Sequence, residues 1–441
     1  MMRSTLARST IVLGAALTAW GVVGCAPPAP TDRRVPEILI VGVDGFDWNI
    51  VDPLVEAGRM PVMERLLAEG TRADLLTLVP LEKSPVIWTT IATGRLPDEQ
   101  GRGFLTPSEG AVEMGRAYTS RNRRYRAFWN ILPTHDVSVS VLGWLETWPA
   151  EEVSGSIVSD YVQYYVAGEK RGAGMPQRTY PEDLYDEIEP FVVYPRDVTD
   201  EELAPLLGGA DEPGDRPAFV ESGLDALRWI YAGDRSFVAL AREFLANRSE
   251  DVMAVYLRGP DAVCHRFWGA RAAVATGNRS NEAEWFGDTV DRYFEITDTF
   301  LGEIVAGIDL ERTTLVLVSD HGFQGGRRAL DGSVRSGIWM HRELGTLLMV
   351  GPLAAGRGVQ ARGARVQDVL PTVLHALDLP IAEDMDGEVV RELLSERGGR
   401  DRAPKLLPSY ETGEPRRPAE IVENPVESQI RERVTSLGYL E

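Results

Sequence analysis

Cysteine and histidine are both scarce in this sequence. Its 441 residues include two cysteines, Cys25 and Cys264, and five histidines. At most one disulfide can therefore form within the chain, so its stability must come from a buried apolar core. The composition, 44% hydrophobic and 26% charged, supplies such a core and excludes a collagen-like, mucin-like or wholly disordered chain.

Positive charge is also in short supply. Lys and Arg number 46 against 67 Asp and Glu, which gives a formal net charge of −21. A broad negative field repels polyanions before contact, so no nucleic-acid polymer is expected as a partner. A small anionic substrate stays compatible with this charge where local cations or metal ions invert the field.

Apolar stretches of membrane-spanning length are lacking after the N-terminal segment. Residues 1–24 carry Arg3 and Arg8 and then an apolar stretch over residues 11–23, which is short for a membrane span. This layout is typical of a secretory signal peptide. We therefore leave residues 1–24 out of the fold and expect a globular body outside the membrane.

The signal-like segment ends at a cysteine. The sequence Gly21-Val22-Val23-Gly24-Cys25, followed by Ala26, resembles a bacterial lipoprotein signal that is cleaved before a lipid-modified cysteine. The resemblance implies a lipid anchor on Cys25 and a place in the bacterial cell envelope, facing the periplasm. Ala26 stands where an inner-membrane retention Asp would be, which indicates the outer membrane. An uncleaved N-terminal anchor and an ordinary signal peptide with a chance cysteine are the alternatives.

Continuous apolar runs mark the predicted strands. Such runs lie at residues 38–43, 137–142, 252–257 and 314–318, with helical patterns between them. Strands that are apolar on both faces belong to mainly parallel sheets covered by helices. Helices are predicted over residues 61–68 and 284–306. The sequence therefore predicts an α/β fold with a mainly parallel central sheet sandwiched by helices.

Composition also divides the chain into segments. Residues 25–36 are rich in Pro and Arg and are predicted to form an extended tether, and the folded domain extends over residues 37–395. Between about residues 160 and 234, Gly, Pro, Tyr and acidic residues dominate, which predicts an inserted lid near the site. Residues 396–441 are predicted to be a polar tail with a short helix near residues 430–434.

Three of the predicted strands are followed by an aspartate. Asp44 comes directly after the first strand, Asp320 follows the strand at 314–318, and Asp261 follows the strand at 252–257 after a short extension. In an open parallel sheet the carboxyl ends of the strands lie along one edge, where ligands bind. The fold is therefore expected to bring three distant carboxylates together.

Three histidines accompany these carboxylates. His321 is adjacent to Asp320, His341 opens an apolar run, and His265 lies four residues after Asp261, on the same face if that segment is helical. A mixed set of Asp and His without thiolates suits zinc, with manganese as the alternative, rather than an all-oxygen calcium site. Each element taken singly also fits a structural role.

A serine stands at the predicted start of a helix. Ser84 followed by Pro85 is typical of a helix N-cap and a first-turn proline, which is a purely structural interpretation. The same position is one where the helix dipole and free amides favour an alkoxide or a phosphate. The segment alone leaves both interpretations open.

These elements together resemble a known family. Five of them occur in the order found in the alkaline phosphatase superfamily, closest to its type I phosphodiesterase/nucleotide pyrophosphatase branch, and the resemblance covers most of residues 37–390. The elements are the strand ending in Asp44, the Ser84 helix with its Thr93-Gly94 end, Asp261 with His265, Asp320-His321-Gly322, and His341.

The resemblance implies a two-zinc hydrolase of small phosphoric esters. Ser84 would be the nucleophile and form a covalent phosphoserine intermediate. By the same resemblance, one zinc ion would be held by Asp44, Ser84, Asp320 and His321, and the other by Asp261, His265 and His341. Two divalent ions can clamp the attacking and leaving oxygens of such a displacement.

Two positions depart from that branch. Its members usually carry an Asn three residues after the nucleophile to hold a phosphate oxygen, and Ile87 stands there. They also carry His-Gly where this chain has Gln100-Gly101. Lys83 and Arg258, each near an expected ligand, are candidates for the missing positive charge, with an ordinary surface position as the alternative.

Three other functions stay open. The first is a phosphomonoesterase of the same superfamily. The second is a sulfatase-like hydrolase, although Ser84-Pro85-Val86-Ile87-Trp88 lacks the Pro and Arg spacing that formylglycine formation requires. The third is a non-catalytic envelope protein that retains the fold to bind a ligand or partner.

Overall fold

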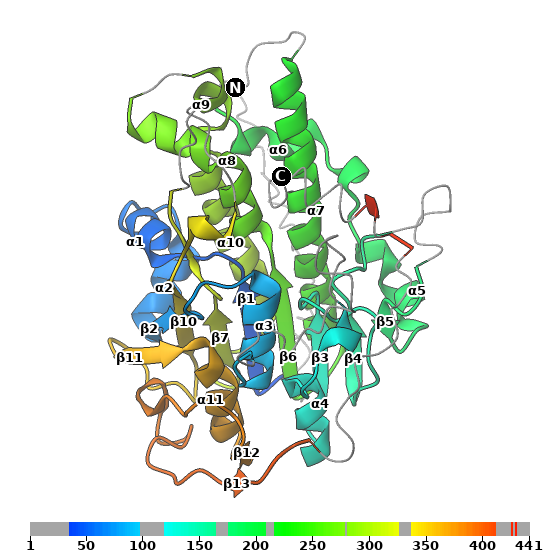
Figure 1. The fold of residues 1–441 in the computed structure, drawn as a ribbon, viewed down its shortest axis with the longest axis vertical. Coiled ribbons are helices and arrows are strands. Elements are labelled where there is room, and N and C mark those ends of the chain that lie inside the picture. The colour runs from blue at the N-terminus through cyan, green and yellow to red at the C-terminus, as the bar shows by residue number, and fades with distance from the viewer. Residues whose placement is uncertain are drawn as a thin grey trace, which may run out of the picture. The chain divides into compact units, whose positions relative to one another are not determined.

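A nine-stranded sheet forms the centre of the computed structural model (Figure 1). The structure describes residues 35–97, 119–164, 175–208, 216–277, 280–325, 337–411, 425–426 and 428–429. Within them the strand order is β11-β2-β10-β7-β1-β6-β3-β4-β5. The strands are β1 Ile38–Val43, β2 Thr71–Leu76, β3 Val139–Leu142, β4 Gly155–Val158, β5 Thr179–Tyr180, β6 Val252–Leu257, β7 Thr314–Val318, β10 Leu344–Val350 and β11 Gln360–Arg365.

The sheet is mainly parallel, as predicted. β1 pairs in parallel with β6 on one side and with β7 on the other, and β3 continues the parallel run from β6 to β4. β10 is antiparallel to both β7 and β2, and β5 is antiparallel to β4. β1, β6 and β7 are buried at every position, which explains their continuous apolar sequences.

The strand predicted over residues 137–142 begins two residues later, at Val139. The backbone nitrogen and the hydroxyl of Ser138 both donate to the Asp251 carboxylate, at 2.9 and 2.7 Å. A side-chain acceptor thus takes the backbone N–H that a strand residue would offer to its neighbour. Ser138 still reaches β6 through its carbonyl, which accepts from the Val252 nitrogen at 3.0 Å, and the strand itself starts at Val139.

The two faces of the sheet carry separate apolar cores. Along β1, Leu39 and Val41 belong to one core and Ile38 and Ile40 to the other, because successive side chains point to opposite faces. The first core is covered by α1 Trp48–Glu56, α2 Pro61–Glu69, α7 Ala218–Asn247, α8 Gly259–Ala275, α9 Asn281–Phe286 and α10 Thr289–Val305, and the second by α3 Ser84–Thr93, α4 Phe128–Ile131 and α11 Val369–Ala376. Helices thus sandwich the sheet, which confirms the predicted fold class.

The prediction of a single helix over residues 284–306 is wrong. The structure has two helices there, α9 and α10, which are separated at Gly287 and Asp288. Gly287 packs so closely on α8 that an added Cβ would lie 2.3 Å from the Val274 side chain. The absence of a side chain lets α9 end against α8. The apolar residues predicted to share one side are buried as expected: Val290, Tyr293, Phe294, Leu301 and Ile304.

The segment predicted as an insertion contains regular elements of its own. Between residues 175 and 208 lie β5, α5 Leu184–Ile188 and α6 Asp200–Leu203. α7 starts at Ala218, so the boundary expected near residue 234 falls inside this 30-residue helix. At the other end, β13 Leu406–Leu407 pairs with β12 Ile381–Ala382, so the chain beyond residue 396 still contacts the domain.

No helix in the part of the chain that the structure describes is long and apolar enough to cross a membrane. Several predictions fall elsewhere in the chain. Residues 1–34, which include Cys25 and most of the tether, lie outside the described residues, as do Gln100 and residues 430–434 of the predicted terminal helix.

Candidate metal and nucleophile centre

The candidate centre lies at the carboxyl ends of three neighbouring strands. Asp44 follows β1, Asp320 follows β7, and Asp261 lies in the first turn of α8 after β6. Because β6, β1 and β7 are adjacent and parallel, their ends meet at one edge. The backbone joins them there as well, since the nitrogen of Asp261 donates to the carbonyl of Asp44 at 3.0 Å.

His321 lies at the middle of the three carboxylates. Its Nε2 atom is 3.5 Å from Asp44 Oδ1, 3.4 Å from Asp320 Oδ2 and 3.9 Å from Asp261 Oδ1. Its Nδ1 atom is 3.0 Å from the carbonyl oxygen of Gly322, which orients the ring. One imidazole nitrogen therefore faces all three carboxylates, and the other is held by the backbone.

Two further histidines face Asp261. The Nε2 atoms of His265 and His341 are 3.3 and 3.7 Å from Asp261 Oδ1, and they are 2.9 Å from each other. Asp261 and His265 are four residues apart on α8, so they share one face of that helix, as predicted. His341 comes from β9 His341–Arg342, which pairs with β8 Gly322–Phe323 next to His321.

Ser84 completes the group at the start of α3. Lys83, rather than Ser84, is the N-cap residue, and Ser84 is the first helical residue. The Ser84 side chain therefore does not cap the helix. Its Oγ atom lies 3.2 Å from His321 Nε2 and 3.5 Å from Asp44 Oδ1. Ser84 is half-buried, while the other six residues of the centre are buried.

The structure thus brings together all seven residues that the sequence singled out. We call this group the centre: Asp44, Ser84, Asp261, His265, Asp320, His321 and His341.

Burial makes two of the carboxylates hard to ionise without a cation. Desolvation, and then the charges of Asp320 and Asp261, raise the pKa of Asp44 well above its ordinary value. Burial is also the main cause that raises the pKa of Asp320 to about 8, and the charge of Asp261 adds to it. Three carboxylates at this spacing repel one another unless positive charge lies between them.

The second half of the centre has the opposite electrostatics. Burial alone would raise the pKa of Asp261, but the charges and hydrogen bond of the surrounding histidines, His265 first, hold it below its ordinary value. Burial, followed by repulsion from His321, lowers the pKa of His341 to about 2. The His341 imidazole is therefore neutral at pH 7, which is the protonation state that a metal ligand requires.

The residues present fit divalent cations. Two overlapping buried groups, Asp44–Asp320–His321 and Asp261–His321–His341, each offer ligand atoms within 4.8 Å of one another. The Oδ2 atom of Asp320 and the Nδ1 atom of His341 are buried and have no hydrogen-bond partner among the described residues. Imidazole with carboxylate is a donor set that suits zinc. Bound cations would also relieve the repulsion among the three carboxylates.

Two residues that the sequence did not single out hold Asp44. The Tyr256 hydroxyl and the Trp88 indole nitrogen both donate to Asp44 Oδ2, the second at 3.3 Å. They leave Oδ1 directed toward Ser84 and His321. The only sequence signal for Tyr256 is a hydroxyl inside an otherwise aliphatic strand.

Two further carboxylates hold the elements that carry the ligands. Asp47 accepts hydrogen bonds from the Phe323 backbone nitrogen at 2.8 Å and from Arg342 Nε at 2.9 Å, which ties β8 and β9 to the end of β1. Asp234 accepts from the backbone nitrogens of Arg258 and Gly259 at 2.9 and 3.1 Å, which fixes the start of α8. Nothing in the spacing of these residues indicated either role.

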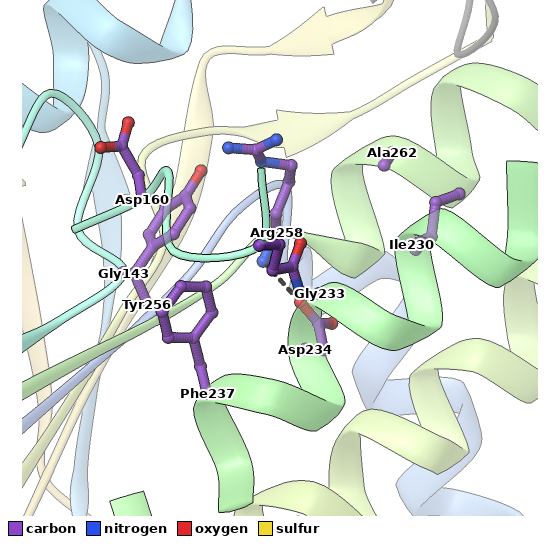
Figure 2. Close-up of a pocket in the computed structure, with 10 residues that line it drawn as sticks. Gly143, Asp160, Ile230, Gly233, Asp234, Phe237, Tyr256, Arg258 and Ala262 are labelled. Carbon is purple, nitrogen blue, oxygen red and sulfur yellow. Dashed lines mark hydrogen bonds between the residues drawn. The ribbon is translucent and has the colours of Figure 1, made fainter. Parts of the chain in front are cut away.

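One departure from the expected pattern, Ile87, and the two candidate cations, Lys83 and Arg258, have different environments. Ile87 lies on α3 and is fully buried in the second apolar core. Lys83 is exposed. Arg258 is half-buried and lines a cavity next to the centre, together with Tyr256 and Asp160 (Figure 2).

Comparison with known proteins identifies one family model that matches this chain. Its description is type I phosphodiesterase/nucleotide pyrophosphatase, and the match extends over residues 38–398. No curated protein matches the sequence.

Solved structures with a similar fold share little sequence with this chain. The phosphonoacetate hydrolase of Sinorhizobium meliloti 1021 is 17% identical with a TM-score of 0.39, and the match covers 69% of this chain and 60% of that one. Murine ectonucleotide pyrophosphatase/phosphodiesterase 5 is 13% identical with a TM-score of 0.45, and the match covers 81% of this chain and 100% of that one. A 2-O glycosaminoglycan sulfatase, BT1596, is 10% identical with a TM-score of 0.48, and the match covers 82% of this chain and 74% of that one.

The family match extends over most of the chain and includes all seven residues of the centre. The chain therefore belongs to the type I phosphodiesterase/nucleotide pyrophosphatase family.

Proposed function

We propose that this protein hydrolyses small phosphoric esters, as a phosphodiesterase or nucleotide pyrophosphatase, through a covalent phosphoserine intermediate on Ser84. The observation that carries the proposal is the position of the Ser84 hydroxyl. It is the half-exposed member of an otherwise buried group, and its oxygen lies 3.2 Å from His321 Nε2 and 3.5 Å from Asp44 Oδ1. Ser84 is thus the residue of the centre that is partly open to solvent.

The residues of the centre would share two tasks. Asp44, Asp320 and His321 would hold one zinc ion beside Ser84, and Asp261, His265 and His341 would hold the second. Bound divalent cations supply positive charge that lowers the pKa of the serine hydroxyl and stabilises the phosphoryl oxygens during displacement. Tyr256 and Trp88 orient the Asp44 carboxylate so that one oxygen stays directed toward Ser84.

The reaction takes two displacements at phosphorus. In the first, the deprotonated Ser84 oxygen attacks, the bond to the ester oxygen breaks, and the leaving group departs as an alkoxide that takes a proton from solvent. In the second, water attacks the phosphorus of the seryl intermediate, the bond between phosphorus and Ser84 Oγ breaks, and Ser84 regains a proton. The product released is a phosphomonoester when the substrate is a diester or a nucleotide pyrophosphate. Positioning and charge stabilisation account for most of the rate in phosphoryl transfer.

The location of this activity is a separate part of the proposal. The sequence around Cys25 supports a lipid anchor in the bacterial cell envelope, with the enzyme on the periplasmic side of the outer membrane. Small phosphate esters would reach it there.

Hydrolysis by matched variants tests the proposal. Full-length protein purified in detergent should hydrolyse bis(p-nitrophenyl) phosphate or p-nitrophenyl phosphate when zinc is present, and Ser84→Ala should abolish this activity. Thr90→Ser on the same helix is the control, because Thr90 is buried and its hydroxyl bonds only within the helix among the described residues. Activity that survives in Ser84→Ala would remove the nucleophile, and with it the proposal.

A further inference from the structure

Glu146 is a buried acid in a backbone conformation that glutamate rarely adopts. It follows β3 by four residues, at the carboxyl edge of the sheet, and β3 is a parallel neighbour of β6. Its φ angle is 62°, in the left-handed region, and the residue is 3% exposed. A left-handed backbone is unfavourable for a residue with a Cβ atom, so such a position indicates that the side chain is needed there.

Asp160 holds the backbone of Glu146 in this conformation. Asp160 lies two residues after β4, the strand next to β3. Its carboxylate accepts hydrogen bonds from the backbone nitrogens of Glu146 and Trp148 at 3.1 and 3.2 Å, and from the Thr147 hydroxyl at 3.3 Å. Three consecutive residues are thus fixed to the end of a neighbouring strand. The Glu146 side chain therefore extends from a well-defined point.

The side chain of Glu146 reaches the helix that begins at Ser84. Its Oε2 atom accepts a hydrogen bond from the Thr89 hydroxyl at 3.2 Å, and both residues are buried. Its Oε1 atom is buried as well and has no hydrogen-bond partner among the described residues. Within that part of the chain, Thr89 therefore supplies the hydrogen bond that the Glu146 carboxyl receives.

Two adjacent residues of α3 form hydrogen bonds to acidic groups at the edge of the sheet. Trp88 donates to Asp44 after β1, and Thr89 donates to Glu146 after β3. The apolar side chains of α3 pack into the second core, and such contacts have no directional preference. Thr89 lies five residues after Ser84, roughly 7.5 Å along the helix axis. A shift of α3 at Thr89 would therefore move Ser84 as well.

The Glu146 carboxyl favours its neutral form. Burial is the main cause that raises its pKa well above the ordinary value. The hydrogen bond from Thr89 and the charge of Arg123 lower the pKa, and the charge of Asp160 raises it. A neutral carboxyl keeps an oxygen that accepts from Thr89. Glutamine matches it in shape and offers an amide oxygen in the same place.

We propose that Glu146 is a positioning residue for the proposed hydrolysis, because its contact with Thr89 sets where α3 places the Ser84 hydroxyl relative to the metal ligands. This inference rests on the proposed function, since it concerns the same nucleophile. Among the described residues, Glu146 forms no hydrogen bond to the centre, so it acts on the reaction through α3. Misplacing a reacting group by about 1 Å can lower a rate about 100-fold.

Steady-state kinetics of the full-length protein loaded with zinc test the assignment. In Glu146→Ala, kcat for bis(p-nitrophenyl) phosphate should fall about 10- to 100-fold, while KM and zinc affinity change less than about threefold. Glu146→Gln should keep kcat within about threefold of the natural protein, because its amide oxygen still accepts from Thr89. An unchanged kcat in Glu146→Ala would overturn the proposal, and so would equal losses in the two variants.

Asp298→Ala is the matched control for a general loss of stability. Asp298 is a buried carboxylate that accepts from the backbone nitrogens of Val62 and Met63 at 3.0 and 2.7 Å, at the start of α2. Its loss should destabilise the fold but leave kcat within about threefold of the natural protein. A fall in kcat as large as that of Glu146→Ala would overturn the proposal, because destabilisation alone would then explain both losses.

A double-mutant cycle tests the connection to α3. Thr89→Val removes the hydroxyl and keeps a side chain of similar shape, so kcat should fall by a factor similar to that of Glu146→Ala. Adding Thr89→Val to Glu146→Ala should lower kcat less than about threefold further, because the two residues share one hydrogen bond. Losses that multiply in the double variant would overturn the connection.

Hydrogen exchange separates this inference from the proposed function, because it needs no turnover. Glu146→Ala should raise the exchange rates of the α3 backbone amides about 10-fold, and Glu146→Gln should leave them unchanged. Unchanged exchange in Glu146→Ala would overturn the inference even if Ser84 is the nucleophile. Activity that survives in Ser84→Ala would instead remove the proposed function without altering the exchange result.

The glutamine variant keeps the inference testable if Glu146→Ala does not fold. Glu146→Gln retains the acceptor for Thr89, so its kcat and its α3 exchange rates should both match those of the natural protein. A loss of kcat of more than about 10-fold in Glu146→Gln, with KM and zinc affinity unchanged, would overturn the proposal, because the carboxyl would then have a task other than positioning α3.

Discussion

The Tyr256 hydroxyl donates a hydrogen bond to Oδ2 of Asp44, and this contact links the middle of the sheet to the centre. Trp88 donates to the same oxygen at 3.3 Å. With Oδ2 occupied, Oδ1 is the Asp44 atom directed toward Ser84 and His321. The orientation of one expected metal ligand is therefore set by two aromatic residues outside the seven of the centre.

Removing that hydroxyl should weaken metal binding. Tyr256→Phe keeps the ring and its packing but frees Asp44 Oδ2, so we expect zinc affinity to fall about 10- to 100-fold, as for other groups that orient a ligand. Competition with a chromogenic chelator measures it. Tyr185→Phe is the matched control, because that hydroxyl bonds to the Tyr194 hydroxyl at 2.9 Å, in another part of the fold. Equal affinities in the two variants would contradict a role for Tyr256 in holding Asp44.

Metal removal should make the stability of the protein depend on pH. An acid whose pKa is raised by folding binds more protons in the folded state, so stability is present at low pH and is lost as pH rises. Asp320, with its pKa raised to about 8 by burial first, and Asp44, raised in the same direction, both act this way in the metal-free protein. His341 acts in the opposite direction, because burial lowers its pKa to about 2 in the folded state. In the unfolded state it loses its proton around an ordinary pKa of about 6.5, so this smaller opposing change is largely complete by about pH 7.5.

Between about pH 6.5 and 8, the free energy of unfolding of the chelator-treated protein should therefore fall by about 1 kcal/mol for each pH unit. Urea denaturation at several pH values measures this slope. Adding zinc should remove most of it, because the cations replace the protons that Asp44 and Asp320 would otherwise bind. A metal-free protein that becomes more stable from pH 6.5 to 8 would contradict this account.

The Asp47 carboxylate should be needed for stability. It is fully buried and accepts hydrogen bonds from Arg342 Nε and the Phe323 backbone nitrogen. Asp47→Ala leaves these donors without their acceptor, and we expect the free energy of unfolding to drop by about 3 kcal/mol, the typical cost of breaking a buried charge pair. The half-exposed pair between Arg72 and Asp52 is the control, where Asp52→Ala should cost less than about 1 kcal/mol. Chemical denaturation measures the free energy of unfolding of both variants. Equal losses in Asp47→Ala and Asp52→Ala would refute the prediction.

A methyl group at Gly259 should disturb the start of α8. Its Cβ would lie 2.2 Å from Asp234 Oδ2, so either the Asp234 carboxylate or the helix must move. We expect Gly259→Ala to cost about 1–3 kcal/mol of stability and to lower zinc affinity, since α8 carries Asp261 and His265. Asp234→Asn keeps an acceptor oxygen, so it should lose less stability and less zinc affinity than Gly259→Ala. Unchanged zinc binding in Gly259→Ala would show that α8 can shift without moving its ligands.

Much of the candidate centre follows from rules that act along the chain. Asp44 comes directly after one apolar strand and Asp320 two residues after another, and the carboxyl ends of neighbouring parallel strands share an edge. The i,i+4 spacing of Asp261 and His265 needs only that the segment be helical, and it is. Positions of this kind can be predicted because the helical period and the order of the strands determine them.

The surroundings of these ligands depend on contacts between distant segments. Tyr256 hydrogen-bonds to Asp44, which is 212 residues away in the sequence. Arg342 hydrogen-bonds to Asp47, which is 295 residues away. The break between α9 and α10 likewise depends on the packing of Gly287 against α8. The spacing of apolar residues along this segment does not indicate that contact. A hydrogen bond across two strands leaves no spacing pattern in either of them.

The mainly parallel sheet, the strand ends and the residues able to hold metal could be predicted from the chain alone, because continuous hydrophobicity and the position of each polar group relative to a strand are local properties. Three features appear only in the folded molecule: which oxygen of Asp44 faces Ser84, the burial of Ile87 in the core, and the cavity that Arg258 lines together with Tyr256. Those features depend on side-chain direction and packing between strands, which are set when the chain is folded.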